Sequence, residues 1–271
     1  MKCCVRAAAL LLALLAAPAA AQPGVPTPLR EVGFDQNLGG SVPLDARFSD
    51  EQGNEVELGR FFGERPVILS LVYYECPMLC SMALNGLVGS LRVLDESIGD
   101  EFEVVTVSFD PEETSALAAG KKQSYVASYA REGAADAWHF LTGEAESIRE
   151  LTNAVGFRYV YDEQTAQFAH AAGIVLLTPE GKIARYFYGI EYPGRDLRLG
   201  LVEASEGRIG NVVDQVLLYC FQYNPETGSY AAVALNIVRL AAVLTIVGIA
   251  LLLLVLRRGE RRVRSQVSPT G

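Results

Sequence analysis

A continuous apolar stretch, Pro66–Tyr74, is the strongest structural signal in the chain. Its residues are aliphatic, β-branched or aromatic apart from the first proline and one serine, which is typical of a strand buried on both faces. The segment Ser81–Leu91 has apolar residues at helical spacing, so we expect a helix there. A second buried strand is predicted at Phe102–Phe109, and it ends at Asp110-Pro111.

Weaker patterns complete an alternation of strands and helices. The resulting order is strand, helix, strand, helix, then an antiparallel hairpin and a helix, which is the order of a thioredoxin-like α/β fold. The further predictions are an N-terminal hairpin (44–48 and 56–58), helices at 112–131 and 144–155, a short strand or loop at 138–141, an extended piece at 157–161, a hairpin (174–177 and 183–188) and helices near 196–206 and 211–219.

The N-terminus carries an apolar segment of another kind. Residues 1–21 combine a positive start, an apolar core and an Ala-x-Ala pattern, which is typical of a cleaved signal peptide. An uncleaved anchor is the alternative, but the run is short for a membrane span. The proline-rich residues 22–34 are predicted to be a flexible lead-in, and residues 35–222 are predicted to be the folded exported domain.

A longer apolar segment lies near the C-terminus. We predict a linker at 223–234, a transmembrane helix at 235–256 and a basic tail at 257–271. Arginines dominate the tail, so the positive-inside rule places it in the cytoplasm. Arg239, inside the predicted span, can extend to the interface. The folded domain is then expected on the periplasmic, extracytoplasmic side of the cell membrane, held by a single C-terminal anchor.

The exported part of the chain is strongly acidic. Between residues 22 and 238 there are 15 basic and 31 acidic residues, a formal charge near −16. Such a field disfavours nucleic acid as a partner, and it suits a cationic partner, a metal ion or a soluble surface. Signal cleavage would leave three cysteines, Cys76, Cys80 and Cys220, and an odd number argues against a purely structural disulfide framework.

Two of these cysteines form the motif Cys76-Pro77-Met78-Leu79-Cys80, between the first buried strand and its helix. The positive end of a helix favours a thiolate over a thiol, so we expect lowered thiol pKa values there. At a spacing of four, both sulfurs can lie on one helical face, with Cα atoms about 6 Å apart. The pair can therefore form a disulfide, and its spacing also suits a metal ion.

A third donor is needed, and the chain has two histidines. His170 lies just before the strand at 174–177, in a loop that faces the cysteine helix in a thioredoxin-like sheet. Thioredoxins have a cis-proline in that loop, but residues 169–174 contain no proline. Two sulfurs and one imidazole suit copper in either oxidation state, and zinc less selectively. A hydrogen-bonded loop histidine without a ligand is the alternative.

Other candidate side chains have ordinary structural explanations. His139 lies among large apolar residues and is expected to be a satisfied core histidine rather than a ligand. Met78 and Met82 could supply a thioether but are expected to pack. Asp110 either orients a ligand or starts the next helix. Cys220 is expected to be a buried, inert thiol, with a resolving thiol as the alternative.

At this point the chain resembles the Sco/SenC family over roughly residues 35–205. The resemblance rests on the strand leading into Cys76-Pro77-Met78-Leu79-Cys80, on Val107-Ser108-Phe109-Asp110-Pro111, and on His170 followed by a strand, Thr178-Pro179-Glu180-Gly181 and a further strand. It implies a thioredoxin-like fold and a copper ion, Cu(I) or Cu(II), bound by Cys76, Cys80 and His170. It also implies a role in assembling the dinuclear copper site of cytochrome c oxidase subunit II, by copper delivery, by thiol reduction or by both.

One departure concerns the tether, because family members usually have an N-terminal helix. Here a signal peptide and a C-terminal anchor are predicted instead.

Two functions from different classes are consistent with these residues. The first is a copper-binding assembly factor, whose partners are subunit II or a similar copper client, the membrane, and a copper donor or thiol reductant. The alternative is a dedicated thiol–disulfide oxidoreductase, an enzyme acting on exported proteins that contain cysteines. Against the enzyme stand the extra residue between the cysteines and the missing proline opposite them.

Overall fold

The computed structural model describes residues 31–76, 79–210, 223–224, 229–230 and 241–249. Contacts divide the chain into two compact units. The larger is Pro26–Gln215, and the other combines Met1–Val25 with Val216–Gly271. The predicted signal peptide (1–21), Pro77, Met78, the helix predicted at 211–219 and Cys220 lie outside the described residues.

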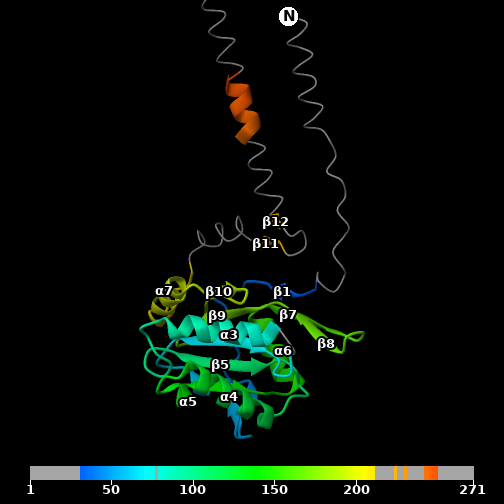
Figure 1. Cartoon of the computed structure of the whole chain (residues 1–271), viewed down its shortest axis with the longest axis vertical. Coiled ribbons are helices and arrows are strands. Elements are labelled where there is room, and N and C mark those ends of the chain that lie inside the picture. Colours follow the sequence, from blue (N-terminus) through cyan, green and yellow to red (C-terminus); the bar gives the residue numbers. More distant parts are fainter. Residues whose placement is uncertain (1–30, 77–78, 211–222, 225–228, 231–240, 250–271) are drawn as a thin grey trace, which may run out of the picture. The chain divides into compact units, whose positions relative to one another are not determined.

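A five-stranded sheet forms the centre of the larger unit (Figure 1). Its strands are β4 (Val67–Val72), β5 (Glu103–Ser108), β6 (Trp138–Leu141), β9 (Gly173–Leu177) and β10 (Ile183–Tyr188), in the order β10-β9-β4-β5-β6. β4, β5 and β6 are parallel, whereas β9 is antiparallel to both β4 and β10. Every residue of β4 is buried, as its continuous apolar sequence predicts.

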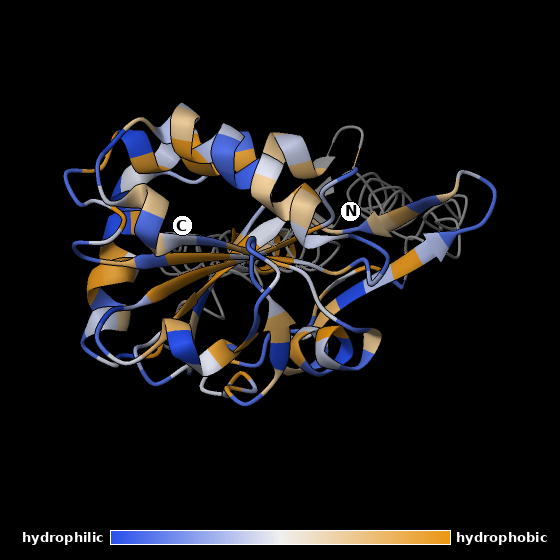
Figure 2. Ribbon diagram, turned by 90° about the horizontal axis from the view of Figure 1, so that it is seen from below, coloured by the Kyte–Doolittle hydropathy of each residue, from blue (hydrophilic) through white to orange (hydrophobic). Residues whose placement is uncertain are grey.

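Helices lie on both sides of these strands, which are the most hydrophobic part of the ribbon in Figure 2. α4 packs against β6, α7 packs against β9 and β10, and α3 contacts both α4 and α7. The bounds are η1 (Leu58–Phe61), α3 (Leu79–Arg92), α4 (Ser115–Tyr129), α5 (Ala134–Ala137), α6 (Ala145–Ala154) and α7 (Gly194–Ser205). α4 begins later than predicted because Thr114 Oγ1 accepts the Leu117 N–H and caps it there.

A second, three-stranded sheet has the order β1-β7-β8 and is wholly antiparallel. Its strands are β1 (Gly33–Phe34), β7 (Phe157–Asp162) and β8 (Gln167–His170). Two predictions are corrected here. Gly33–Phe34 belongs to this sheet rather than to a flexible lead-in, because the Phe34 ring packs on Phe157, 5.0 Å away. His170 ends a strand rather than lying in a loop, because β7 and β8 pair as a hairpin.

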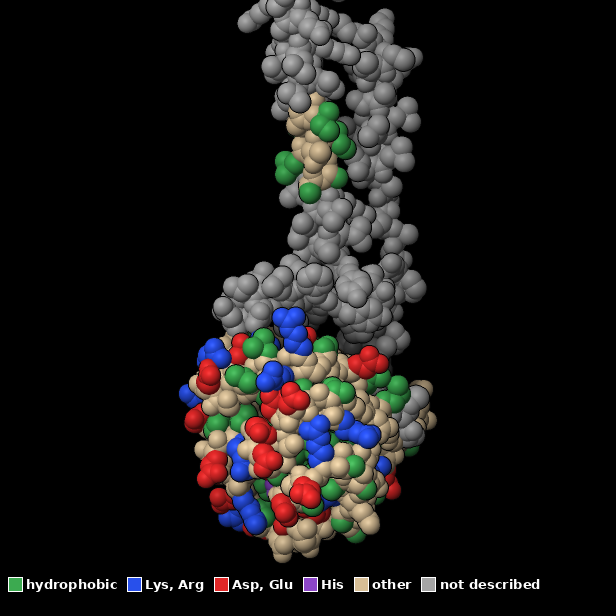
Figure 3. All heavy atoms as spheres, turned by 60° about the vertical axis from the view of Figure 1, so that its left-hand side comes forward, with side chains coloured by type: hydrophobic (Ala, Val, Ile, Leu, Met, Phe, Trp, Pro, Cys, Tyr) green, Lys and Arg blue, Asp and Glu red, His purple; other side chains and the backbone are tan. Residues whose placement is uncertain are grey.

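A short hairpin, β2 (Arg47–Ser49) and β3 (Glu55–Glu57), confirms the prediction near the N-terminus. Both signs of charge are interspersed over the face of the larger unit shown in Figure 3, with apolar side chains between them.

In the other unit, β11 (Tyr223–Asn224) pairs with β12 (Ser229–Tyr230), and residues 241–249 are helical. No described helix is both long enough and apolar enough to span a bilayer. Most of the span predicted at 235–256, and the whole tail at 257–271, lie outside the described residues.

Candidate metal site

The two thiols of the CxxxC motif flank the junction between β4 and α3. The chain turns directly after β4, where the Cys76 N–H donates to the Tyr73 carbonyl at 3.3 Å. Cys80 lies in the first turn of α3, and its N–H donates to Cys76 Sγ at 3.3 Å. The carboxyl end of a parallel strand that leads into a helix is a usual place for a site in open α/β sheets.

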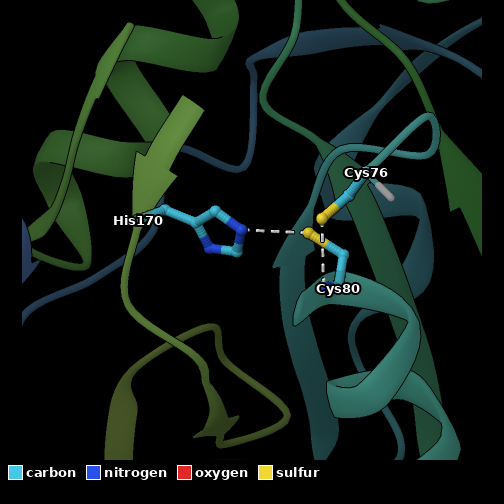
Figure 4. Close-up of side chains that lie close together, drawn as sticks. All are labelled: Cys76, Cys80 and His170. Carbon is cyan, nitrogen blue, oxygen red and sulfur yellow. Dashed lines mark hydrogen bonds between the residues drawn. The ribbon is translucent and has the colours of Figure 1, made fainter. Parts of the chain in front are cut away.

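His170 brings an imidazole to the same point from a different sheet. Its Nε2 is 3.1 Å from Cys80 Sγ (Figure 4). The three donor atoms, from Cys76, Cys80 and His170, all lie within 4.8 Å of one another. The cysteines are 8% and 2% exposed, His170 is half-buried, and the two thiols are not joined in a disulfide.

A backbone carbonyl fixes the protonation pattern of the imidazole. His170 Nδ1 is 2.9 Å from the carbonyl oxygen of Ala171. Because a carbonyl oxygen only accepts hydrogen bonds, Nδ1 carries the proton and Nε2 keeps its lone pair toward Cys80. Burial lowers the pKa of His170, although the bond to Ala171 opposes that shift. The imidazole is therefore neutral, and its unprotonated Nε2 can accept a thiol proton or bind a metal ion.

The thiol of Cys80 does not follow the expectation from its helix terminus. Burial raises its pKa well above the usual range, although the Tyr73 N–H, which donates to Cys80 Sγ at 3.4 Å, opposes that shift. Desolvation of the charged form therefore outweighs the helix terminus. A cation that binds here must displace the proton from this sulfur.

Aromatic rings surround the imidazole on the protein side. The ring centroids of Tyr73, Phe109 and Phe157 lie 5.7, 5.2 and 6.3 Å from that of His170. Phe109 also contacts Phe168, two residues before His170 in β8, at 5.6 Å. These contacts hold the histidine strand against the end of β4 and β5.

The structure separates the remaining candidates from this cluster. His139 lies in β6, with its Nε2 3.6 Å from Glu103 Oε2 and its ring 4.3 Å from that of Phe61. Glu103 begins β5, opposite the first residue of β4, so this pair is at the other end of the sheet from the thiols. Asp110 does not orient His170, because the two ring nitrogens contact the Ala171 carbonyl and Cys80 Sγ. Its Oδ1 instead accepts the Glu112 N–H at 2.9 Å. Met82 is 45% exposed.

Sequence reasoning missed one polar residue beside the site. Glu113 is half-buried and accepts hydrogen bonds from the backbone immediately before Cys76. Burial raises its pKa, and the bonds from Ser108, Tyr74 and Glu75 oppose that shift. Its neighbour Glu112 is exposed, and no local pattern distinguishes the two carboxylates before the fold is known.

The donor set fits a soft metal ion. Two thiol sulfurs and one imidazole nitrogen with a free lone pair are ligands that copper accepts in either oxidation state. Zinc accepts the same donors, but its structural sites usually have four protein ligands. Two donors at the junction of β4 and α3 and one at the end of β8, within 4.8 Å of one another, can bind one ion.

Comparisons with known proteins agree with this fold. The chain matches the SCO1/SenC protein family over residues 40–197. A crystal structure from Aquifex aeolicus VF5, described provisionally as an electron transfer protein, is similar with 29% identity and a TM-score of 0.56, over 64% of this chain and 96% of that one.

Two further solved structures support the fold at lower identity. Arabidopsis thaliana ScoI with copper bound is 19% identical, with a TM-score of 0.50 over 63% of this chain and 99% of that one. A SCO1/SenC family lipoprotein from Bacillus anthracis is 15% identical, with a TM-score of 0.52 over 64% of this chain and 99% of that one. None of the curated proteins compared with the chain matches it.

Proposed function

Because the chain belongs to the SCO1/SenC family, we propose that it binds copper through Cys76, Cys80 and His170 and helps to assemble a copper enzyme. The observation that carries this proposal is the convergence of two thiols and a neutral imidazole within 4.8 Å of one another. The resemblance to the family further points to the dinuclear copper site of cytochrome c oxidase subunit II as the client.

Copper is the cargo in this proposal, so the site must both bind and release it. Binding requires two reduced sulfurs, and both thiol protons leave as the ion enters. When a two-electron oxidant, such as a client disulfide, converts Cys76 and Cys80 to a disulfide, both sulfur ligands are lost together and the ion is released. The redox state of the pair therefore decides whether cargo is held.

The same pair can reduce a client disulfide. One thiolate attacks the client disulfide and forms a mixed disulfide, and the second thiol then displaces the client sulfur. Two electrons and two protons pass to the client, which leaves with two thiols, while Cys76 and Cys80 become a disulfide. Copper delivery and reduction of a client disulfide thus depend on the same two residues, whether the chain performs one of these steps or both in succession.

We further propose that residues 235–256 anchor the chain in the membrane, with residues 257–271 in the cytoplasm and the folded unit outside it. The support is the apolar sequence and the arginines that follow it. Alkaline carbonate extraction tests this directly. The full chain is expected to stay with the membrane and a chain ending at residue 230 to be released. Release of both would contradict the anchor.

Copper titration of the reduced full chain, followed by visible absorption, tests the site. One equivalent of Cu(II) is expected to give intense sulfur-to-copper charge-transfer bands that disappear in Cys76→Ser and in Cys80→Ser. His170→Ala is expected to shift or remove them. His139→Ala is the matched control, because this second histidine lies at the far end of the sheet beside Glu103. Bands that survive in either cysteine variant would refute the assignment.

A thiol–disulfide oxidoreductase remains the second candidate, favoured by the Cys80 N–H that donates to Cys76 Sγ at 3.3 Å. A backbone donor at a helix terminus is a usual environment for the attacking sulfur of a thiol–disulfide exchange. This candidate predicts reduction of a disulfide substrate by the metal-free chain, with no specific copper binding. Specific copper binding with negligible reductase turnover would favour the assembly factor.

A further inference from the structure

Glu113 links two segments of the chain at the base of the candidate metal site. It lies between β5 and α4, and its Oε2 and Oε1 accept the N–H groups of Tyr74 and Glu75, each at 2.7 Å. Oε2 also accepts the hydroxyl of Ser108, the last residue of β5, at 2.5 Å. One carboxylate thus joins the end of β5 to the turn that precedes Cys76.

The two backbone N–H groups come at the point where the strand ladder has ended. β4 stops at Val72, and Tyr74 and Glu75 belong to the turn that leads to Cys76. Tyr74 is 2% exposed, so water cannot replace the partner of its N–H. Bonds to an ionised carboxylate are shorter and stronger than neutral ones, and two consecutive N–H groups fix the orientation of the peptide planes.

We propose that Glu113 is a positioning residue of the donor site, holding the turn at residues 73–76 so that Cys76 Sγ faces Cys80 and His170. Its carboxylate acts through the backbone of Tyr74 and Glu75, to which it is hydrogen-bonded. For copper this inference rests on the proposed function. For the two thiols the inference does not depend on copper, because the turn also sets the position of Cys76 relative to Cys80.

Two substitutions of Glu113 and one control variant distinguish the effect of side-chain length from the effect of charge. Glu113→Gln keeps the length of the side chain but presents an NH₂ group where one backbone N–H or the Ser108 hydroxyl now donates. Glu113→Asp keeps the charge but is one methylene shorter and cannot reach both N–H groups. Glu112→Gln is the matched control, since it makes the same chemical change on the exposed neighbour.

Hydrogen exchange of the metal-free full chain gives the first measurement. Selective ¹⁵N-tyrosine labelling reports 12 backbone amides, of which Tyr74 is bonded to Glu113. In Glu113→Gln and Glu113→Asp this amide is expected to exchange at least about tenfold faster than in wild type or Glu112→Gln. Unchanged exchange would mean that the carboxylate does not hold the turn in solution, and the proposal would be wrong.

Closure of the disulfide gives a second, copper-free measurement. Equilibration with reduced and oxidised glutathione at fixed pH yields the effective concentration of one thiol toward the other. Both Glu113 variants are expected to lower it by at least about tenfold, because a loosened turn no longer orients Cys76. Faster Tyr74 exchange with unchanged disulfide closure and unchanged copper binding would leave Glu113 a purely structural residue and overturn the inference.

Copper titration then connects the result with the proposed function. Both Glu113 variants are expected to bind copper at least about tenfold more weakly, with shifted charge-transfer bands, while Glu112→Gln behaves as wild type. If Glu113→Asp behaves as wild type and Glu113→Gln does not, charge rather than position is responsible, and the inference is wrong. If wild type binds no copper, the proposed function fails, but exchange and disulfide closure still decide the role of Glu113.

A milder variant guards against misfolding. Ser108→Ala removes one donor to Glu113 Oε2 and leaves the carboxylate in place. It is expected to change Tyr74 exchange and disulfide closure in the same direction, by less. If neither Glu113 variant folds, an unaltered Tyr74 amide and unaltered disulfide closure in Ser108→Ala would overturn the inference.

Discussion

The sulfur donors and the imidazole belong to two differently built parts of the larger unit. Cys76 and Cys80 directly follow β4, which is hydrogen-bonded to β5 on one side and to β9 on the other. His170 ends β8, an edge strand that is bonded only to β7 and has no fully buried residue. Tyr161 of β7, opposite Phe168 of β8, is 51% exposed.

This difference indicates which donor is free to adjust. Backbone hydrogen bonds in the centre of a sheet open only with global unfolding, whereas edge strands open locally at lower cost. The sulfur pair is therefore held by the core, and the imidazole depends on side-chain contacts with Tyr73, Phe109 and Phe157. We expect β8, which carries His170, to be the part of the site that moves when a metal ion binds or leaves.

Removal of the Phe109 ring, which lies between the end of the central sheet and β8, should have the largest effect on stability. Phe109 is 0% exposed and contacts Tyr73 on one side and Phe168 on the other. Phe109→Ala is expected to lower the free energy of unfolding by about 3–5 kcal/mol, since a large buried side chain is lost. Urea denaturation measures this, and a loss below about 1 kcal/mol would contradict the packing described here.

The next largest effect is expected at a buried ion pair, which is compared below with an exposed ion pair of the small sheet. Lys122 and Glu51 form a salt bridge in which the side chains are 16% and 6% exposed. Lys122→Met leaves a buried carboxylate unpaired and is expected to cost about 3 kcal/mol at pH 7. Lys121→Met is the control, because this neighbour is not in the pair.

The sign of the pH dependence follows from Glu51. Burial alone would raise its pKa, but the hydrogen bond from Lys122 and further interactions lower it below the ordinary value of 4.5. The stabilisation is therefore complete above about pH 4.5 and is lost as the pH falls through the lower folded-state pKa. Denaturation at pH 7 and pH 3 should show a larger cost of Lys122→Met at pH 7, and an equal cost would contradict this origin.

Loss of the imidazole should have a smaller effect that depends on the oxidation state. His170→Ala is expected to weaken Cu(II) binding by at least about tenfold, or about 1.4 kcal/mol, and Cu(I) binding by less. Cu(I) favours the soft thiolates that this variant keeps, whereas Cu(II) also favours imidazole. Competition titrations with chelators for each ion measure both affinities, and Cu(II) held as tightly as in wild type would exclude His170 as a ligand.

The smallest effect is expected at the rim of the small sheet. Arg158 bonds Asp35 at 2.9 Å, but the side chains are 42% and 69% exposed. Asp35→Asn is expected to change the free energy of unfolding by about 0–1 kcal/mol, because solvent screens such pairs. A cost comparable to that of Lys122→Met in the same denaturation assay would mean that the edge sheet is as tightly held as the core.

The same contrast explains what the sequence could predict. β4, β5 and α3 are specified by long apolar runs and by helical spacing, so their place and the thiols between them follow from local pattern. β8 has four residues and no clear alternation, and it exists because β7 pairs with it. The sequence therefore predicts that His170 lies near the thiols, where its Nε2 is 3.1 Å from Cys80 Sγ, but it places the residue in a loop instead of at the end of a strand.

Two properties of the site depend on packing and have no local signal. The pKa of Cys80 is raised because the folded chain buries its sulfur, whereas the motif alone indicates a helix terminus and the opposite direction. Glu113 meets the N–H groups of Tyr74 and Glu75 only once β4 and β5 lie side by side. Both depend on contacts between residues far apart in the chain.

The distance along the chain between the donors also sets the order in which the site is completed. Cys80 and His170 are 90 positions apart, whereas the two cysteines are four apart. At roughly 5–20 residues per second, synthesis places the imidazole roughly 5–18 s after the thiols. A nascent chain thus exposes a reactive sulfur pair without its third donor, and a chaperone or a reducing environment that protects thiols in this interval would raise the yield of competent protein.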